Sequence, residues 1–312
     1  MTCIPLDVVV VGNIGVDTNI YLYGEEIDFS VEANFTQNFD CVGQAGGYAS
    51  RGYRRLGYST AFIGSIGEDF NGRYIRETLA RDGIDLEGVF TDPAGTSRSV
   101  NIMYKDGRRK NFYDGKGHMT LHAPVEISRR IFSSARLAHF NIPNWARQLL
   151  PVAKECGLPI AVDLQDVIDI NDPYRQDFIN AADYLFFSAA NQRDPGEIAQ
   201  ELLRRRPELI IIAGMGAQGC LLATSTKGLQ YFPAIEMVQP VIDTNGAGDS
   251  LAVGFLSSYL LQGLSLDEAI QRGQIAARFC CTQKASSDTL ITMNELDHLS
   301  GRGGNAISEG NS

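Results

Sequence analysis

Short apolar runs alternate with segments of helix length along most of the chain. The first run, residues 6–11, is rich in β-branched residues and ends at Gly12-Asn13, which is typical of a strand buried on both faces. Similar apolar runs follow at residues 59–64, 137–140, 159–163, 184–187 and 209–213. Residues 71–82 are typical of the intervening helices, because Asn71 suits a helix start and Gly83 a helix end. This alternation predicts an α/β fold with a mostly parallel sheet and helices on both faces.

Two stretches, residues 19–42 and 96–113, depart from this rhythm. They lack helical periodicity and mix polar with apolar or aromatic residues, and the second contains the turn Lys105-Asp106-Gly107. We interpret both as strands of a small accessory sheet inserted into the main fold. The chain is therefore expected to form one domain over residues 1–300, followed by a disordered tail at 301–312 that is rich in Gly, Ser and Asn.

Composition and charge exclude several classes of function. Hydrophobic residues make up 44% of the 312 residues and charged residues 21%, as in an ordinary soluble globular protein. The net charge of −10 opposes binding to nucleic acid, which depends on cationic side chains that neutralise phosphates. No apolar run approaches the length of a membrane span, and the N-terminus lacks the pattern of a signal peptide. We therefore expect a cytoplasmic protein with no nucleic-acid or membrane partner.

The cysteines and the short basic runs change this picture little. The six cysteines form no CxxC pair and have no zinc-like spacing to histidine, so we interpret them as buried apolar residues in a reducing compartment. Residues 108–110 and 204–206 are basic, and we interpret both runs as solvated turns or helix ends. For residues 108–110, contact with an acidic or phosphorylated substrate is the alternative.

The strongest chemical signal lies at residues 243–250, which read Asp-Thr-Asn-Gly-Ala-Gly-Asp-Ser and lead into the helical segment 251–262. A Gly-Ala-Gly turn that opens a helix presents several backbone N–H groups at the positive end of the helix dipole, where phosphate oxygens bind well. Asp249 at this turn would accept the proton of an attacking hydroxyl while the amides neutralise charge on the phosphoryl group. The alternative is a simple loop in which Asp249 only caps the helix.

Residues 243–249 resemble the C-terminal signature of the ribokinase-like (PfkB) carbohydrate kinases. Residues 43–57 and 62–72 are similar to the N-terminal signature of the same family. Asp17 after the first strand and residues 214–219 after a late strand extend the resemblance over most of the chain. The resemblance implies a ribokinase-like fold in which the two accessory stretches form a β-sheet lid. It also implies an enzyme that uses ATP and Mg²⁺ to phosphorylate a hydroxyl, expected to be a hydroxymethyl group, of a sugar or related small molecule.

The resemblance also assigns residues to the site. Asp249 would be the general base, and the amides of Gly246, Ala247 and Gly248 would form the anion hole. Substrate contacts are implied for Asp17, Asn13, Gly43, Gln44, Gly47 and Tyr48, and nucleotide contacts for Ser188, Asn191, Gly214, Gly216, Gly219, Thr244 and Gln274. Asp243 and Asn245 are implied as part of a site for a monovalent cation such as K⁺, and the lid as a surface for a homodimer. On residue type alone, Asp17 and the glycines equally suit plain turns, and Gln274 equally suits the surface.

Three departures from the family pattern bear on function. Gln44 and Tyr48 stand where the family commonly has a glycine and an asparagine, which we interpret as altered sugar contacts, with the Tyr48 ring available for stacking. Residues 188–191 read Ser-Ala-Ala-Asn and lack the acidic member of the family's Asn-x-x-Glu motif, so metal handling is expected to differ. Ala285 replaces a common glycine beside the cation site. We expect a sugar kinase, with a nucleoside kinase of the same fold as one alternative and a catalytically weakened nucleotide- or sugar-binding regulator as another.

Overall fold

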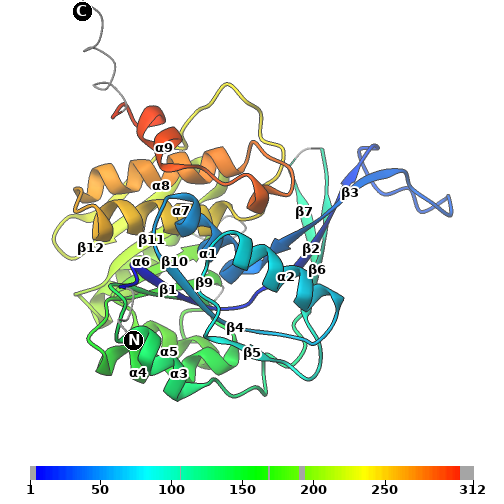
Figure 1. The fold of residues 1–312 in the computed structure, drawn as a ribbon. Helices are drawn as coiled ribbons and strands as arrows, with labels where there is room; N and C mark the ends of the chain where they lie inside the picture. The colour runs from blue at the N-terminus through cyan, green and yellow to red at the C-terminus, as the bar shows by residue number, and fades with distance from the viewer. Residues whose placement is uncertain (1–4, 106, 168, 190–193, 303–312) are drawn as a thin grey trace, which may run out of the picture.

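The computed structural model describes residues 5–105, 107–167, 169–189 and 194–302 and has a large sheet between two layers of helices (Figure 1). Within these residues the large sheet has nine strands in the order β13-β12-β11-β10-β9-β8-β1-β4-β5. Its strands are β1 (Val8–Val11), β4 (Thr60–Ile66), β5 (Val89–Thr91), β8 (Ala138–Phe140), β9 (Ile160–Asp166), β10 (Tyr184–Ser188), β11 (Ile210–Gly214), β12 (Cys220–Thr224) and β13 (Gly228–Phe232). The β11–β12 and β12–β13 pairings are antiparallel and the others are parallel. The predicted α/β fold with a mostly parallel sheet is confirmed.

The direction in which strands are added to the sheet reverses between β1 and β8. From β1 the chain proceeds to β4 and β5 on one side, whereas β8, β9, β10 and β11 follow on the other side. In parallel α/β sheets, ligands bind beyond the carboxyl ends of the strands at such a reversal. Asn13 and Asn141 follow the carboxyl ends of β1 and β8 and therefore mark the expected ligand crevice.

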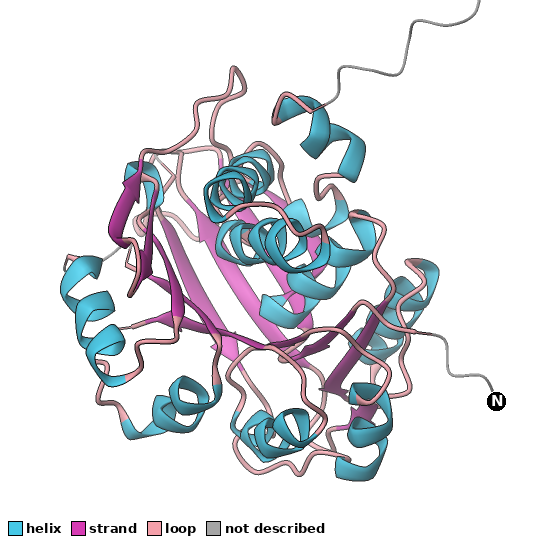
Figure 2. Cartoon of the chain, turned by 90° about the vertical axis from the view of Figure 1, so that its left-hand side faces the viewer, coloured by secondary structure: helices cyan, strands magenta, loops and turns pink. Residues whose placement is uncertain are grey.

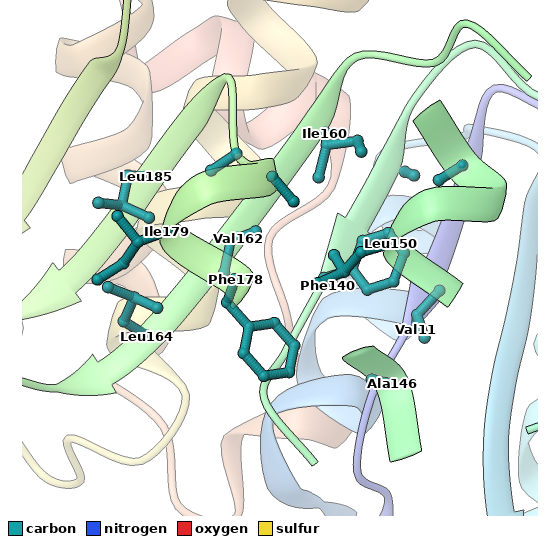
Figure 3. Packing of buried hydrophobic residues seen from close by; sticks show 14 of the residues in the cluster. Val11, Phe140, Ala146, Leu150, Ile160, Val162, Leu164, Phe178, Ile179 and Leu185 are labelled. Atoms are coloured by element: carbon teal, nitrogen blue, oxygen red, sulfur yellow. The ribbon is translucent and has the colours of Figure 1, made fainter. Parts of the chain in front are cut away.

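Helices cover both faces of the large sheet, as predicted (Figure 2). Side chains of a strand alternate between its faces, so that Val9 and Val11 of β1 belong to one core and Val8 and Val10 to the other. The first core includes residues of α3 (Val125–Phe132), α4 (Leu150–Glu155), α5 (Pro173–Ala181) and α6 (Pro195–Arg205), and Figure 3 shows part of it. The second core includes residues of α1 (Gln44–Arg55), α2 (Phe70–Arg81), α7 (Ala247–Leu256), α8 (Leu266–Cys280) and α9 (Met293–Leu299).

The accessory sheet predicted from the two irregular stretches is present. Its strands are β2 (Gly15–Leu22), β3 (Thr36–Gly43), β6 (Ser97–Met103) and β7 (Arg109–Asp114), in the order β3-β2-β6-β7. β2 begins at Gly15 rather than at the predicted Asn19, so that Asp17 belongs to this lid sheet itself. Asp17, Asn19 and Tyr21 alternate onto the buried face of β2. One face of a single lid strand therefore presents all three side chains to the main domain.

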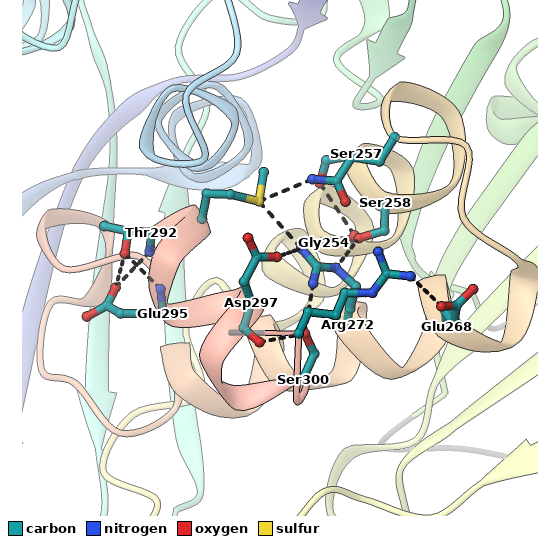
Figure 4. A network of polar contacts seen from close by, with 12 residues as sticks. Gly254, Ser257, Ser258, Glu268, Arg272, Thr292, Glu295, Asp297 and Ser300 are labelled. Carbon is teal, nitrogen blue, oxygen red and sulfur yellow. Dashed lines mark hydrogen bonds and ion pairs between the residues drawn. The ribbon is translucent and has the colours of Figure 1, made fainter. Parts of the chain in front are cut away.

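A buried arginine, Arg272, connects α8 to the residues that follow α7 and to α9. Arg272 of α8 is 1% exposed and donates hydrogen bonds to Ser258 Oγ at 2.9 Å and Ser300 Oγ at 2.8 Å. Its Nη2 also lies 2.8 Å from Oδ1 of Asp297 in α9 (Figure 4). A buried guanidinium with several acceptors resists displacement, because losing one partner leaves a buried charge uncompensated. These contacts help to hold α7, whose first turn carries Asp249.

Two helix boundaries differ from the prediction. The carboxylate of Asp69 accepts the Gly72 N–H at 2.8 Å and caps α2, so the prediction that Asn71 is the cap is wrong. α7 begins at Ala247, and residues Ser257–Leu261 continue it as a π-helical turn.

Nearly all of the predicted tail falls outside the described residues. None of the described helices combines the length and the apolar character that crossing a membrane requires.

Candidate active site

The turn before α7 is built around Gly246. This residue caps the helix with φ +76° and ψ 1°, a left-handed conformation that favours glycine. The ring of Tyr48 packs directly behind it, because a Cβ on Gly246 would lie 2.3 Å from Tyr48 Cδ1. Gly248, in contrast, faces open space, since a Cβ there would meet no atom within 4 Å. The turn is therefore supported on one side and accessible on the other.

The backbone N–H groups of this turn remain available to a ligand. Within the described part of the chain, no group accepts a hydrogen bond from the N–H of Gly246 or Gly248, and the Ala247 N–H reaches only the Thr244 carbonyl at 3.4 Å. The first turn of a helix has no intrahelical acceptors for its N–H groups and carries the positive end of the helix dipole. The turn thus has the donors and the electrostatics of a phosphate-binding site.

Asp249 is half-buried in the first turn of α7, beside these donors. Burial raises the pKa of Asp249 well above its ordinary value, and the neighbouring Asp163 carboxylate raises it further. The Arg109 guanidinium acts in the opposite direction on the same pKa. A carboxylate with a raised pKa is a stronger proton acceptor when ionised, as general base catalysis requires.

Asp17 is buried on β2 with one oxygen unused. Burial of this side chain, which is 4% exposed, raises the pKa of Asp17 to about 6. Its Oδ2 accepts the Gln44 N–H at 3.3 Å, whereas its Oδ1 has no hydrogen-bond partner among the described residues. Gly43 permits this approach, because a Cβ there would lie 2.1 Å from Asp17 Oδ2. A buried acceptor without a partner is costly to leave alone and is therefore a good candidate for binding a ligand hydroxyl.

Amide side chains near the carboxyl ends of β1 and β8 also have buried polar atoms without hydrogen-bond partners among the described residues. Gln44, which has φ +61°, accepts the Ser97 hydroxyl at 3.2 Å through Oε1, but its Nε2 is buried without a partner among the described residues. Asn141 is 2% exposed, and neither its Oδ1 nor its Nδ2 has a partner within that set. Asn13 donates from Nδ2 to the Tyr113 hydroxyl of the lid at 2.8 Å. These polar groups line the expected ligand crevice from the core side.

Two residues predicted to bind substrate have other surroundings. Tyr48 is 3% exposed and packs with Cys280 and Leu290 behind the Gly246 turn, so its ring is not presented for stacking as we expected. Its hydroxyl is buried without a partner among the described residues. Gly47 faces the core, because a Cβ there would lie 3.4 Å from side-chain carbons of Ile14 and Val42. Both positions support the site from behind.

The residues predicted to bind nucleotide cluster around the ends of β10 and β11. Ser188 pairs with Gly214 across these strands, and Gly216 and Gly219 form the turn into β12 with φ values of +59° and +101°. Gln274 of α8 adjoins them, since its Nε2 donates to Cys220 Sγ at 3.1 Å, and its Oε1 is buried without a partner in the described chain. Thr244 lies in the Gly246 turn instead. Asn191 falls outside the described residues.

Two oxygen-bearing groups of the residues predicted to help bind a monovalent cation, the Asp243 carboxylate and the Asn245 carbonyl, already have protein donors. Asp243 accepts the Tyr21 hydroxyl at Oδ2 and the Asn245 N–H at Oδ1, the latter at 2.7 Å. The Asn245 carbonyl accepts the Ser286 hydroxyl at 2.9 Å and the Cys280 thiol at 3.2 Å. Burial, followed by the Asp243 carboxylate, raises the pKa of Tyr21, so that this phenol keeps its proton and acts as a donor.

The lid sheet reaches the Gly246 turn through polar side chains. Arg109 of β7 is exposed, as expected for residues 108–110, but its Nη1 also donates to Asn245 Oδ1. Asn245 Nδ2 donates to Asn19 Oδ1 at 3.2 Å, and the Asn101 side chain donates to the same oxygen at 3.0 Å. Asn111 extends the row by donating to Asn101 Oδ1 at 2.7 Å. The lid is thus hydrogen-bonded to the turn that leads into α7.

Sequence reasoning missed three residues of this site, Tyr21, Asn141 and Asp163, and gave Arg109 only as an alternative substrate contact. Asn141 and Asp163 carried a usable signal, because each is a polar residue at the carboxyl end of an apolar strand, as Asn13 is. Burial raises the pKa of Asp163 to about 6, and Asp163 accepts the Gln165 N–H at 2.8 Å. Tyr21 and Arg109 carried no such signal, since their partners lie far away in the sequence.

A separate cavity of about 230 Å³ lies outside this site. Its lining comes from α8, α9 and the segments that follow β13 and α8, and includes Met237, Phe279 and His298. It contains none of the residues predicted to bind substrate or nucleotide.

Comparison with known proteins gives a consistent result. The sequence model of the pfkB family carbohydrate kinases matches residues 6–293. Acarbose 7(IV)-phosphotransferase of Actinoplanes sp. is 27% identical over 282 residues, which cover 90% of this chain and 93% of that protein. Fructoselysine 6-kinase of Escherichia coli is 26% identical over 223 residues, which cover 72% of this chain and 83% of that protein.

Solved structures share the fold over nearly the whole chain. A microbiome-derived acarbose kinase, Mak1, has a TM-score of 0.87 and 28% sequence identity, covering 96% of this chain and all of that one. Ribokinase of Arabidopsis thaliana, solved with ribose and ATP, has a TM-score of 0.79 at 21% identity and covers 95% of this chain and 99% of that one. The second likeness supports the fold alone.

Proposed function

Because this chain belongs to the pfkB family of carbohydrate kinases, we propose that it transfers the γ-phosphoryl group of ATP to a hydroxyl, expected to be a hydroxymethyl group, of a sugar, with Asp249 as general base. One observation carries this proposal: a carboxylate with a raised pKa lies in the same helical turn as the N–H groups of Gly246 and Gly248, which have no acceptor among the described residues. A base and an anion hole side by side are what phosphoryl transfer requires.

In the proposed phosphoryl transfer, one bond to the γ-phosphorus forms and one breaks. The substrate hydroxyl gives its proton to the Asp249 carboxylate, and its oxygen forms a bond to the γ-phosphorus. The bond from that phosphorus to the bridging oxygen breaks, and ADP leaves. The N–H groups of Gly246, Ala247 and Gly248 stabilise the charge on the transferred group, while Asp17 and Asn141 orient the sugar through hydrogen bonds.

The metal is expected to arrive with the nucleotide. Among the described residues, no cluster of three or more His, Cys, Asp or Glu side chains could hold an ion. Mg²⁺ binds few protein ligands and keeps several waters when it accompanies ATP, and it would supply charge neutralisation for the phosphates. Ser188, Gly214 and Gln274 are proposed to contact the nucleotide itself.

Arg109 is proposed to add positive charge from the lid. Its guanidinium binds the Asn245 side chain and lowers the pKa values of Asp17, Asp243 and Asp249 through its charge, although burial raises all three. A cation placed so close to the base and the anion hole favours negative charge on the transferred phosphoryl group. Lid closure would at the same time exclude water and limit ATP hydrolysis.

The substrate class is best tested with a panel. Acarbose, fructoselysine and fructose represent the sugars named for relatives, and ribose and adenosine represent the ribose and nucleoside alternatives. ADP release is measured with each acceptor and without any. A sugar that raises the rate above the background supports the proposal, whereas turnover of nucleosides alone would favour a nucleoside kinase.

Asp249→Asn tests the mechanism. We expect kcat to fall by about 10²- to 10⁴-fold, because the amide cannot accept the proton, while ADP binding is retained. Asp267→Asn is the matched control, since Asp267 also lies in the first turn of a helix but pairs with Lys227 on the surface. Equal kcat in Asp249→Asn and wild type would contradict the assignment and leave Asp249 as a helix-end carboxylate. Ligand binding by wild type without any turnover would favour the regulator.

A homodimer through the lid is a separate proposal. β3 is an edge strand of the lid sheet, and the segment that joins it to β2 exposes Phe29 (90%) and Phe35 (85%). Exposed aromatic side chains next to an unpaired strand edge are typical of an interface. Light scattering should give the mass of a dimer for wild type and of a monomer for the double variant Phe29→Ser with Phe35→Ser.

A further inference from the structure

The loop that leads into the anion hole has a set of oxygen atoms which would suit a monovalent cation. They are the carboxylate of Asp243 and the carbonyl of Asn245, three residues and one residue before Gly246. A K⁺ ion is held when several such oxygens turn their lone pairs toward it and replace its water. The test of fit is therefore whether these lone pairs are free.

Protein donors already occupy part of this set. The Tyr21 hydroxyl donates to Asp243 Oδ2, and the Asn245 N–H donates to Oδ1 of the same carboxylate at 2.7 Å. The Asn245 carbonyl accepts two hydrogen bonds, from Ser286 Oγ at 2.9 Å and Cys280 Sγ at 3.2 Å. These donors use two of the four lone pairs of the Asp243 carboxylate and at least one of the two on the Asn245 carbonyl, so few remain to replace the water around an ion.

The next loop offers an N–H group where a cation would need an oxygen. Ala285 adopts a left-handed conformation with φ +47° and donates its N–H to the Tyr21 hydroxyl oxygen at 2.9 Å. Beside it, the Lys284 ammonium lies 4.8 Å from the centre of the Tyr21 ring and donates to Gln37 at 2.6 Å. The ammonium therefore lies beside the tyrosine that donates to Asp243, and its charge disfavours a second cation next to that ring.

We propose that the Tyr21 hydroxyl takes the place of the monovalent cation at this site, so that catalysis does not depend on K⁺. Tyr21 is then a positioning residue that holds the Asp243 loop, and through it the Gly246 turn, from the lid. The same face of β2 carries Asp17 and Asn19, which contact the substrate crevice and Asn245. One lid strand therefore binds substrate and fixes the anion hole together.

The first test compares salts on the wild-type enzyme. Rates of ADP formation and midpoints of thermal unfolding, the latter with and without ADP, are measured in KCl and in tetramethylammonium chloride at equal ionic strength. We expect kcat to differ by less than about twofold and the unfolding midpoint to be unchanged, since no site awaits the ion. Activation by K⁺ of about fivefold or more, or a midpoint that rises specifically with K⁺, would overturn the proposal.

The second test is Tyr21→Phe, with Tyr23→Phe as the matched control because Tyr23 follows β2 and is 63% exposed. Tyr21→Phe should lower kcat by about 10- to 100-fold with a smaller change in the KM for ATP, since the anion hole loses its support while the nucleotide site is untouched. A wild-type kcat in a folded Tyr21→Phe enzyme would overturn the positioning role. If this variant does not fold, the salt comparison decides alone.

The rate measurements rest on the proposed kinase function, whereas the unfolding measurements do not. A protein without turnover toward any sugar, but with an unfolding midpoint indifferent to K⁺, would contradict the proposed function and still support this inference.

Discussion

Two carboxylates beside the lid, Asp69 and Asp17, differ in how completely they are hydrogen-bonded. Asp69 accepts the Gly72 N–H at 2.8 Å and the Thr96 hydroxyl at 2.7 Å through Oδ1, and the Thr96 N–H at 2.8 Å through Oδ2. Although burial opposes the change, these hydrogen bonds lower the pKa of Asp69. Asp17 is far more buried, and its Oδ1 has no hydrogen-bond partner in the described chain. Burial raises its pKa to about 6, although the Gln44 N–H and the Ser99 side chain act in the opposite direction.

The contrast is what we expect if Asp69 has a structural role and Asp17 the proposed role of binding substrate. Asp69 fixes the start of α2 to the residue before β6, so its charge stabilises the fold. Asp17 is charged at neutral pH, but the described part of the fold leaves one of its oxygens without a hydrogen-bond donor. A ligand hydroxyl can supply that donor. Residues that bind substrate are often destabilising in this way, because the free protein leaves them without partners.

Among the substitutions that test this comparison, Asp17→Asn has the largest expected effect on activity. We expect kcat/KM for the sugar to fall by about 10²- to 10³-fold, because the amide offers donors where the substrate hydroxyl needs an acceptor. The same variant should be more stable than wild type at pH 8, as a chemical denaturation series would show. A kcat/KM within a factor of about two of wild type would remove Asp17 from the substrate site.

The gain in stability expected for Asp17→Asn depends on pH, and its direction follows from the raised pKa of Asp17. Folding raises the pKa of Asp17 from 3.8 to about 6, so ionisation costs stability above that range. Wild-type stability from this group falls as the pH rises from about 4 through about 6, and Asp17→Asn removes that loss. The difference in unfolding free energy should approach roughly 3 kcal/mol at pH 8 as an upper limit and vanish near pH 4.

Asp69→Ala should have the opposite sign and a smaller effect. Removing the cap and the two Thr96 hydrogen bonds should lower the unfolding free energy by about 1–3 kcal/mol at pH 8, with kcat little changed. Because folding lowers the pKa of Asp69, its contribution is present above pH 3.8 and is lost as the pH falls through the folded value. Denaturation curves at pH 8 and pH 4 check both statements, and a gain in stability at pH 8 would refute them.

The two carboxylates also show what the sequence could predict. Strands such as β1 were predictable because an apolar β-branched run is a local pattern, and Asp249 was predictable because its turn, helix and base are contiguous. The Asp69 cap was missed although it is local, since Asn71 nearby has equal capping chemistry. When two neighbouring residues can both cap a helix, tertiary contacts decide between them. Here the contacts are the hydrogen bonds from Thr96 to Asp69.

Long-range partners could not be predicted in the same way. Tyr21 meets Asp243 across 222 positions and Arg109 meets Asn245 across 136, and only the placement of the lid over the main sheet brings them together. Lid strands were predicted, but their register against the catalytic turn depends on tertiary structure. The expectation that the Tyr48 ring is available for stacking failed for the same reason. Helix periodicity alone does not say whether this ring faces the ligand crevice or the Gly246 turn.

Tyr48→Phe gives the smallest and most discriminating change. The Tyr48 hydroxyl is buried without a partner among the described residues, whereas its ring supports Gly246. Removing only the oxygen should therefore leave stability unchanged or raise it by about 1 kcal/mol, because no hydrogen bond is lost. The KM for the sugar should also stay the same, as steady-state kinetics would show. An increase in that KM would mean that the hydroxyl reaches the substrate after all, and would place Tyr48 with Asp17 among the groups that the fold leaves for a ligand.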